Sequence, residues 1–222
     1  MATRHLSGTP GMGERVSIRA HFERFPATVK GAFVLRAADR DPHQVRIEAA
    51  RVREMSGRGS QPIDLAAVTL DVAPNLDLFV PFEFPITELG AGWYGLECDV
   101  AIDGTAENVR PPKRFVVAWP RASVRRGAVK VGKTAQVRGG PKVRVEQIEC
   151  GGDSIRVSYV AAPSEPAVVR LAADGTLLPI LEAEFDQESG QGRVTAYPLL
   201  RSQSRVAIEV RGAPAPIEIA LP

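Results

Sequence analysis

Apolar and polar residues alternate along most of this chain, and a period of two residues is typical of strands with one buried face. The clearest example runs from residue 94 to residue 102, where every second residue is apolar: Tyr94, Leu96, Cys98, Val100 and Ile102. The same period marks residues 16–22, 76–84 and 115–119, and shorter runs follow as far as residue 221. The pattern therefore predicts an all-β protein built from short antiparallel strands.

Turn-forming residues separate these runs. The chain contains 20 glycines and 18 prolines, and Asp103-Gly104 and Asp174-Gly175 are strong signals for tight hairpins. Short strands at regular spacing indicate a sandwich or a barrel, and we predict antiparallel β-sandwiches. Pro81 lies inside one alternating run and cannot donate to a ladder, so we expect an edge strand there. That edge is a candidate protein interface, formed by Val80, Phe82 and Phe84.

The segment 44–55 fits two structures. Val45, Ile47 and Ala49 alternate as in a strand. The apolar residues Val45, Ala49, Val52 and Met55 also lie on one face of a helix, in which Ile47 would be exposed. We favour the strand because the neighbouring segments are predicted strands, but the pattern leaves both structures open.

The distribution of aromatic residues predicts two tandem domains. Ten of the 13 Phe, Trp and Tyr residues precede Pro120, and only Tyr159, Phe185 and Tyr197 follow it. Such a change in core chemistry indicates two separate cores. We predict a flexible leader at 1–13, one sandwich at 14–120 and a second at 121–222.

One stretch of the chain is strongly basic. The sequence has a net charge of +2, yet residues 108–145 contain no Asp or Glu. The stretch carries eleven cations: Arg110, Lys113, Arg114, Arg121, Arg125, Arg126, Lys130, Lys133, Arg138, Lys142 and Arg144. Arg114, Lys142 and Arg144 alternate with apolar residues, so we expect them on solvent-exposed faces.

Three interpretations of the basic stretch remain open. The cations form a solvated face with pairing inside the chain, a surface for a protein partner, or a salt-sensitive site for nucleic acid or anionic lipid. The stretch offers only Phe115 and Trp119 for stacking on bases, which disfavours nucleic acid.

The sequence contains no catalytic motif and indicates no cofactor or metal. Cys98 lies on an apolar face and is expected to be buried, whereas Cys150 precedes Gly151-Gly152 in a predicted turn. Two carboxylate rows, 97–103 and 182–186, offer oxygen ligands for Ca²⁺ but fit the wet face of a strand better. Trp93 and Trp119 could form a platform for a sugar, although Trp119 is in phase with core residues. Two cysteines without a disulfide framework favour a reducing compartment, the cytoplasm.

The run Leu89, Gly92, Tyr94 and Leu96 resembles a signature of late strands in bacterial immunoglobulin-like and fibronectin type III-like domains. The resemblance implies a Tyr hydroxyl that bonds back to the backbone. Residues 14–120 also resemble arrestin-like sandwiches of the sporulation-control type, through Val29-Lys30-Gly31, the run 80–85 and the strand 94–102. This second resemblance implies an adaptor without catalysis.

These observations predict a non-catalytic interaction or scaffold protein that acts through its loops and edge strands. We expect a protein partner and consider a homo-oligomer. Binding of nucleic acid or an anionic surface through residues 110–144 is the alternative, and a carbohydrate binder or enzyme that uses Trp93 and an acidic row is the third hypothesis. No apolar run is long enough for a membrane-spanning helix.

Overall fold

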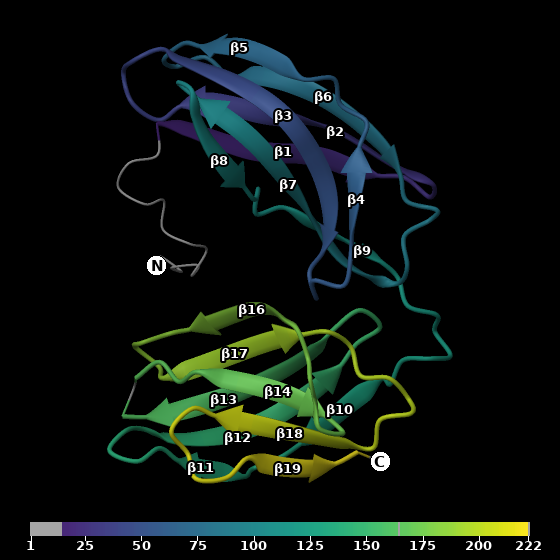
Figure 1. Ribbon diagram of the computed structural model, residues 1–222. Helices are drawn as coiled ribbons and strands as arrows, with labels where there is room; N and C mark the ends of the chain where they lie inside the picture. The colour runs from purple at the N-terminus through teal and green to yellow at the C-terminus, as the bar shows by residue number, and fades with distance from the viewer. Residues whose placement is uncertain (1–14, 164, 222) are drawn as a thin grey trace. The chain divides into compact units, whose positions relative to one another are not determined.

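The computed structural model describes residues 15–163 and 165–221 (Figure 1). The leader predicted at 1–13 lies outside these residues. The described chain contains no helix, and all of its strand pairs are antiparallel, so the prediction of an all-β sandwich fold is confirmed. None of the described residues belongs to a helix long and apolar enough to cross a membrane.

The chain divides between Val117 and Ala118 into two compact units. We call residues 15–117 the first unit and residues 118–221 the second unit. Each unit has its own core of buried side chains. The domain boundary at Pro120 stays a prediction, because compactness alone does not show that each unit folds independently.

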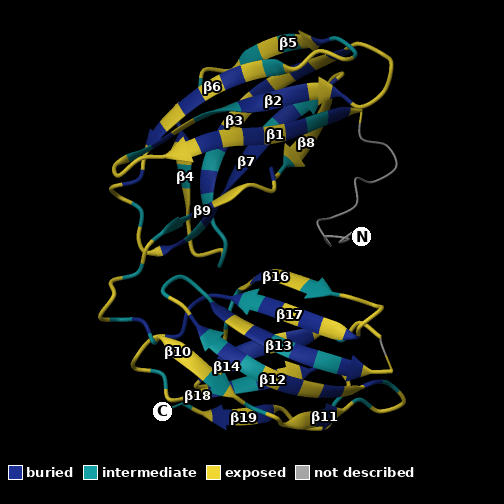
Figure 2. Ribbon diagram, turned by 180° about the vertical axis from the view of Figure 1, so that it is seen from behind, coloured by how far each residue is buried: buried dark blue, intermediate teal, exposed yellow. Residues whose placement is uncertain are grey.

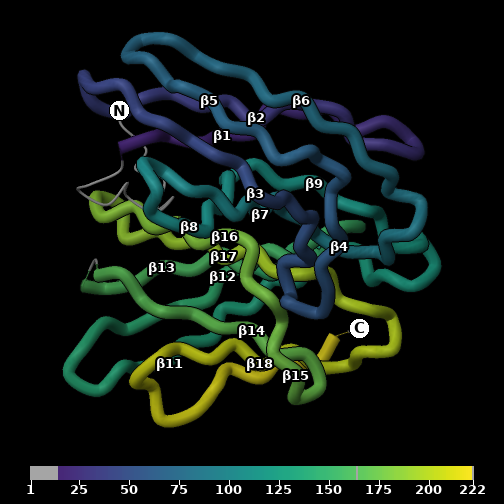
Figure 3. The backbone as a smooth tube through the Cα atoms, turned by 45° about the horizontal axis from the view of Figure 1, so that its top comes forward, coloured from purple at the N-terminus to yellow at the C-terminus, as the bar shows by residue number. Residues whose placement is uncertain are grey.

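The first unit packs a small sheet against a larger one. The three-stranded sheet has the order β1-β2-β6, formed by β1 (Val16–Arg24), β2 (Thr28–Ala37) and β6 (Leu78–Pro85). Figure 3 shows these strands running side by side. The six-stranded sheet contains β3 (His43–Glu54), β4 (Ser60–Ile63), β5 (Val68–Val72), β7 (Gly92–Ile102), β8 (Thr105–Val109) and β9 (Arg114–Val117).

Aromatic side chains from both sheets form the centre of the first core. The Phe33 and Phe82 rings lie 4.7 Å apart, and the Phe115 ring lies 5.9 Å from Phe22 and 5.5 Å from Tyr94. Full burial of such a ring contributes roughly 1.5–3 kcal/mol. The Tyr94 hydroxyl donates a hydrogen bond of 2.9 Å to the Gly90 carbonyl, the backward bond that the resemblance to immunoglobulin-like domains implied.

The ambiguous segment 44–55 lies in strand β3. Ile47, which a helix would expose, is only 1% exposed in the core. A bulge between Ile47 and Ala49 shifts the phase of the strand, so that Ala50 and Val52 face inward and Ala49 faces solvent. The strand was therefore the correct alternative, but the inward position expected for Ala49 was wrong.

The second unit also contains two sheets. The six-stranded sheet is formed by β10 (Gly127–Lys130), β11 (Thr134–Gln136), β12 (Lys142–Cys150), β13 (Ile155–Ala162), β16 (Ile180–Phe185) and β17 (Gln191–Ala196). The four-stranded sheet is formed by β14 (Val169–Ala173), β15 (Thr176–Leu177), β18 (Arg205–Val210) and β19 (Ile217–Ala220). Buried and exposed residues alternate along β12 and β13 (Figure 2).

The second core consists mainly of aliphatic side chains such as Ile148, Leu171 and Ile208. The buried Tyr159 ring covers Gly192, its neighbour on β17, and a Cβ atom there would collide with the ring. Two differently composed cores agree with the uneven distribution of aromatic residues along the sequence.

Gly31 allows a close approach of β2 to β1. A Cβ atom on Gly31 would overlap the His21 carbonyl oxygen and lie 2.5 Å from the Phe22 Cβ atom. We expect Gly31→Ala to lower the free energy of unfolding by about 1–3 kcal/mol, because backbone must shift to relieve the overlap. Urea denaturation followed by Trp93 fluorescence in a Trp119→Phe background reports on the first unit alone.

Gly59→Ala is the matched control, because no atom lies within 4 Å of the corresponding Cβ position. We expect its denaturation midpoint to stay close to that of the parent. Equal midpoints for both variants would contradict the tight approach of the two strands.

Candidate interaction surfaces

Three cations of the basic stretch belong to the first unit, and two of them contact other groups of that unit. Arg110 Nε lies 2.9 Å from Glu97 Oε2. The Lys113 ammonium donates to the Phe22 carbonyl at 2.6 Å and lies 4.5 Å from the centre of the Phe22 ring. Arg114 is exposed on β9, as expected from its alternation with apolar residues. Arg110 and Lys113 therefore contact groups of the first unit itself.

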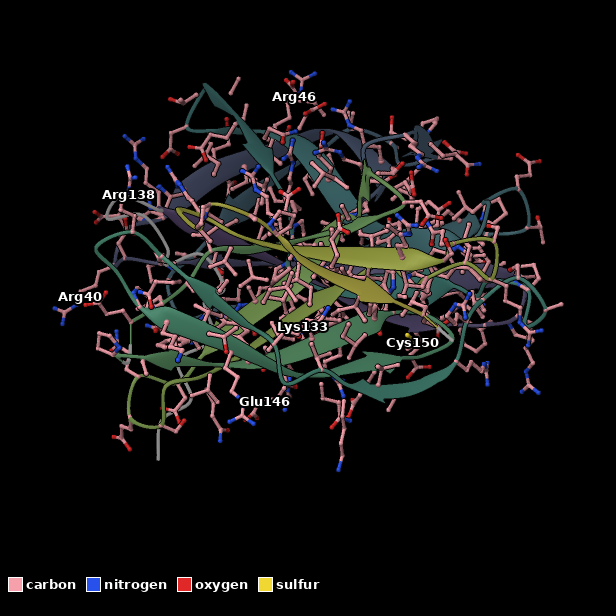
Figure 4. The ribbon with its side chains drawn as sticks, turned by 90° about the horizontal axis from the view of Figure 1, so that it is seen from below. Arg40, Arg46, Lys133, Arg138, Glu146 and Cys150 are labelled. Atoms are coloured by element: carbon pink, nitrogen blue, oxygen red, sulfur yellow. The ribbon has the colours of Figure 1, made fainter. Side chains whose placement is uncertain are left out.

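The second unit carries the other eight cations. The Arg125 guanidinium donates to the Gln203 carbonyl at 2.9 Å, and the Lys133 ammonium donates to the Glu218 carbonyl at 2.6 Å. Lys142 and Arg144 are exposed on β12, as their alternation predicted. Figure 4 shows Lys133 and Arg138 well apart on this unit, so these two do not converge on one point.

Most of these cations lack an ionic partner. Among the described residues, seven have no carboxylate within 4.0 Å: Arg121, Arg126, Lys130, Lys133, Arg138, Lys142 and Arg144. By contrast, Arg156 and Arg193, elsewhere in the six-stranded sheet, pair with Glu149 at 3.3 Å and Glu184 at 3.6 Å. The basic stretch therefore leaves uncompensated positive charge on the second unit.

The first carboxylate row is neutralised by its neighbours. Glu97 is buried beneath three guanidinium groups, those of Arg51, Arg53 and Arg110, at 3.4, 3.4 and 2.9 Å. Burial alone would raise the pKa of Glu97, but hydrogen bonds from Asn108 and Arg110 and the nearby guanidinium charges lower it below its ordinary value. This carboxylate therefore forms part of a charge network on the sheet.

Two members of the second carboxylate row, residues 182–186, also have local partners. Glu184 pairs with Arg193, and Asp186 accepts hydrogen bonds from the Ser189 hydroxyl at 2.7 Å and the Glu188 amide at 3.0 Å. Within the described ranges, no group of three His, Cys, Asp or Glu side chains is arranged to hold a metal ion.

Both cysteines are free and buried. Burial, followed by the charges of Asp99 and Glu97, raises the pKa of the Cys98 thiol to about 12. Cys150 closes strand β12, which corrects its expected place in a turn, and burial raises the pKa of its thiol despite the nearby Arg125. Neither thiol is in the ionised form that attacks a substrate near neutral pH.

The two tryptophans belong to different units, and the second unit contains a groove. The Trp119 ring packs edge-on against Tyr197 at 5.6 Å, and Trp93 belongs to the other unit. A groove of about 490 Å³ in the second unit is lined by one carboxylate, two guanidinium groups and apolar residues: Val168, Arg170, Glu209, Val210, Arg211, Ala213, Pro214, Ala215 and Pro216.

Sequence reasoning missed a buried histidine held between two carboxylates. His43 Nδ1 lies 2.7 Å from Asp103 Oδ2, and Nε2 lies 2.8 Å from Asp39 Oδ1. Asp103 stands in the tight turn between β7 and β8 with a φ of 49°, and its other oxygen accepts the Gln44 amide at 3.0 Å. The three side chains join the start of β3 to the β7–β8 turn. The Asp103-Gly104 turn was visible in the sequence, but nothing there placed His43 beside it.

The candidate interface at residues 80–84 lies on an edge strand, but its side chains face inward. Val80, Phe82 and Phe84 are buried in the core of the first unit. The exposed face of β6 instead carries Phe79, Pro81, Glu83 and Pro85. Any contact made by this strand would therefore use the second set of side chains.

Phe79 is the centre of an apolar patch on the outer face of the three-stranded sheet. Its side chain is 64% exposed, and Pro81 is exposed as well. The cross-strand neighbour of Phe79 is Val34, which is only 7% exposed, and the half-buried Ala32 lies opposite Pro81. We call Ala32, Val34, Phe79 and Pro81 the Phe79 patch. Lys30 pairs with Glu83 at 3.0 Å and Arg36 with Asp77 at 3.7 Å on either side of it. The sequence did contain a signal, because Phe79 is an aromatic residue in the polar phase of the strand.

The His43 cluster predicts how the stability of the first unit depends on pH. Hydrogen bonds to Asp103 and then to Asp39 raise the pKa of His43 above its ordinary 6.5, and hydrogen bonds from His43 lower the pKa values of both carboxyl groups below 3.8. The contribution of His43 is therefore complete below pH 6.5 and is lost as the pH rises through its folded pKa. The contribution of the two carboxylates is lost only in acid. We expect the urea midpoint of the first unit to fall between pH 6 and pH 9.

The matched variants are His43→Gln and His21→Gln, since His21 is exposed on β1. We expect His43→Gln to lower the midpoint at pH 6 and to remove most of the decline at higher pH. His21→Gln should keep the slope of the parent chain. A slope that survives His43→Gln would show that other groups cause it.

Comparisons with known proteins identify no family. No family model matches the chain, and no curated protein sequence matches it. Among solved structures, a conserved domain protein from Bacillus anthracis matches 99% of this chain and 92% of its own length, with 9% identity and a TM-score of 0.35. A marsupial T cell receptor covers 94% of this chain and 62% of its own length, with 12% identity and a TM-score of 0.27. The C-terminal domain of the Streptococcus agalactiae AgI/II polypeptide BspA covers 91% and 96%, with 10% identity and a TM-score of 0.21. Likenesses this weak carry no argument about function.

Proposed function

We propose that this chain is a non-catalytic β-sandwich module that binds a protein partner through the Phe79 patch. The observation that carries the proposal is the 64% exposure of the Phe79 side chain beside Val34, Ala32 and Pro81. An apolar centre with a charged rim is the usual anatomy of a protein interface, and a buried aromatic residue at its centre often supplies much of the binding energy. Both flanking ion pairs supply such a rim.

The remaining features support an adaptor rather than an enzyme. Both thiols have raised pKa values, and the Glu97 carboxylate is held by guanidinium groups. The backward bond from Tyr94 to Gly90 supports an immunoglobulin-like arrangement of the first unit. Two free, buried cysteines fit a reducing compartment, and we place the protein in the cytoplasm.

Affinity capture with Phe79 variants tests the proposal. The full chain is immobilised and exposed to an extract of its native host, and the retained protein is purified and titrated by calorimetry. We expect Phe79→Ser to weaken that binding at least about tenfold, as truncation of an interface anchor does. Phe25→Ser is the control, because Phe25 is 43% exposed in the β1–β2 turn.

Two results would contradict the proposal. One is the recovery of no specific partner at low salt. The other is a partner whose affinity is unchanged by Phe79→Ser, because such a partner must bind elsewhere. Circular dichroism of both variants verifies that they keep the fold.

The uncompensated cations of the second unit favour one alternative function, binding of nucleic acid. Lys142 and Arg144 lie two residues apart on the exposed face of β12, opposite the polar residues Gln136 and Thr134 of β11. Such groups could neutralise backbone phosphates and release counterions. The described face lacks an exposed aromatic residue beside them, which leaves base stacking without a platform.

A mobility-shift assay with a short DNA duplex at low salt tests this alternative. We expect a shifted band that Lys142→Ala/Arg144→Ala abolishes and that raised salt weakens. Arg156→Ala removes an arginine already paired with Glu149, so it should leave the shift unchanged. Free migration of the duplex at low salt would end the alternative.

A further inference from the structure

The two edge strands of the three-stranded sheet, β1 and β6, differ in which residues turn their backbone N–H and C=O groups away from β2. The Ala38 amide donates to the Arg15 carbonyl at 2.8 Å, and the Phe25 amide donates to the Thr28 carbonyl at 2.8 Å. These bonds show that odd-numbered residues of β1 bond to β2, because the direction of the backbone N–H and C=O groups alternates from one residue to the next along a strand. The N–H and C=O groups of Ile18, Ala20 and Phe22 therefore point to the open edge.

The same alternation shows that β6 is closed to a further strand. The Ile86 amide donates to the Ala27 carbonyl at 2.9 Å, so even-numbered residues of β6 bond to β2 and odd-numbered residues face the open edge. Pro81 and Pro85 occupy two of these outward positions, and proline has no N–H to donate. Prolines on an edge prevent the addition of another strand.

By contrast, β1 is an edge without such protection. It has nine residues, contains no proline and pairs with β2 without any shift in register. Within residues 15–163 and 165–221, one side-chain group reaches its outer edge, the Lys113 ammonium on the Phe22 carbonyl. A carbonyl oxygen has two lone pairs, so this contact leaves room for a second donor.

The exposed charges of β1 match a second copy of the same strand. Arg19 and Glu23 lie on its exposed face, and neither has an oppositely charged group within 4.0 Å among the described residues. In an antiparallel pair related by a two-fold axis at His21, Arg19 stands opposite Glu23 of the second copy, and the reverse pair forms as well. Cross-strand pairs of opposite charge stabilise antiparallel strands.

The geometry points to a two-fold dimer of this chain through antiparallel pairing of β1 with β1. In that register Ala20 exchanges backbone hydrogen bonds with Phe22 of the second copy, because both residues face the open edge. The result is one continuous sheet, ordered β6-β2-β1 in one copy and β1-β2-β6 in the next. Both outer edges of this sheet are the proline-containing β6, so assembly stops at two copies. The contact is small, and a weak, concentration-dependent dimer is expected.

Sedimentation velocity of the full chain over a wide range of concentration tests the dimer. We expect a monomer–dimer equilibrium at low ionic strength. Arg19→Glu alone and Glu23→Arg alone should each weaken it about tenfold, because each places like charges opposite one another at two symmetric sites. Arg19→Glu combined with Glu23→Arg restores the opposite-charge pairs and should restore the parent affinity.

Amide hydrogen exchange locates the contact independently. In the dimer, the amides of Ile18, Ala20 and Phe22 should gain protection as concentration rises, while those of Arg19 and His21 are protected in the monomer already. Glu83→Arg makes the same charge change as Glu23→Arg on the closed edge and should leave the dimer intact. Phe79→Ser, which tests the proposed function, should also leave it intact.

A chain that sediments as a monomer at every concentration would overturn the inference. A dimer that is insensitive to both charge reversals, is not restored by the double variant, or gives no protection at Ala20 would overturn it as well, because its interface would lie elsewhere.

Discussion

In the three-stranded sheet, one constraint fixes both the core and the surface: the alternation of an extended backbone. On β1, the residues that send side chains into the core also turn their N–H and C=O groups to the open edge. On β6 the relation is reversed, because the residues with exposed side chains turn their backbone groups to the open edge. These residues are Phe79, Pro81, Glu83 and Pro85. Prolines can close β6 because those positions neither bond to β2 nor fill the core. The open positions of β1 are core positions, such as Ile18 and Phe22, where a proline would remove an apolar side chain.

The sequence predicted the parts of this fold that depend on alternation over several residues. The strand 94–102 needed only a local alternation, and the Tyr94 bond was implied by the resemblance to immunoglobulin-like domains. The bulge in β3 was invisible, because it depends on pairing with β7, and it moved Ala49 from the expected inward position to the surface. Cys150 was misplaced for a similar reason, since β12 extends one residue further than the glycines suggested.

Candidate sites were harder to predict because they combine residues from separate strands. His43 meets Asp39 four residues away but Asp103 sixty residues away, and no local spacing indicates the second contact. The Phe79 patch needs the register of β2 against β6 to bring Val34 beside Phe79. The three residues expected at that edge, Val80, Phe82 and Phe84, were identified by hydrophobicity, and the same hydrophobicity places them in the core.

The cations of the basic stretch have different roles, depending on whether a carboxylate lies near them. In the first unit the guanidinium of Arg110 compensates the buried Glu97, whose isolated charge would be costly. In the second unit Lys142 and Arg144 stand on an exposed face where water solvates them, so no anion is needed for the fold. A charge that the fold does not need is free to serve a contact. The same reasoning applies to the side chains of Arg19 and Glu23, which form no ion pair within 4.0 Å among the described residues and complement each other across the two-fold axis of the proposed dimer.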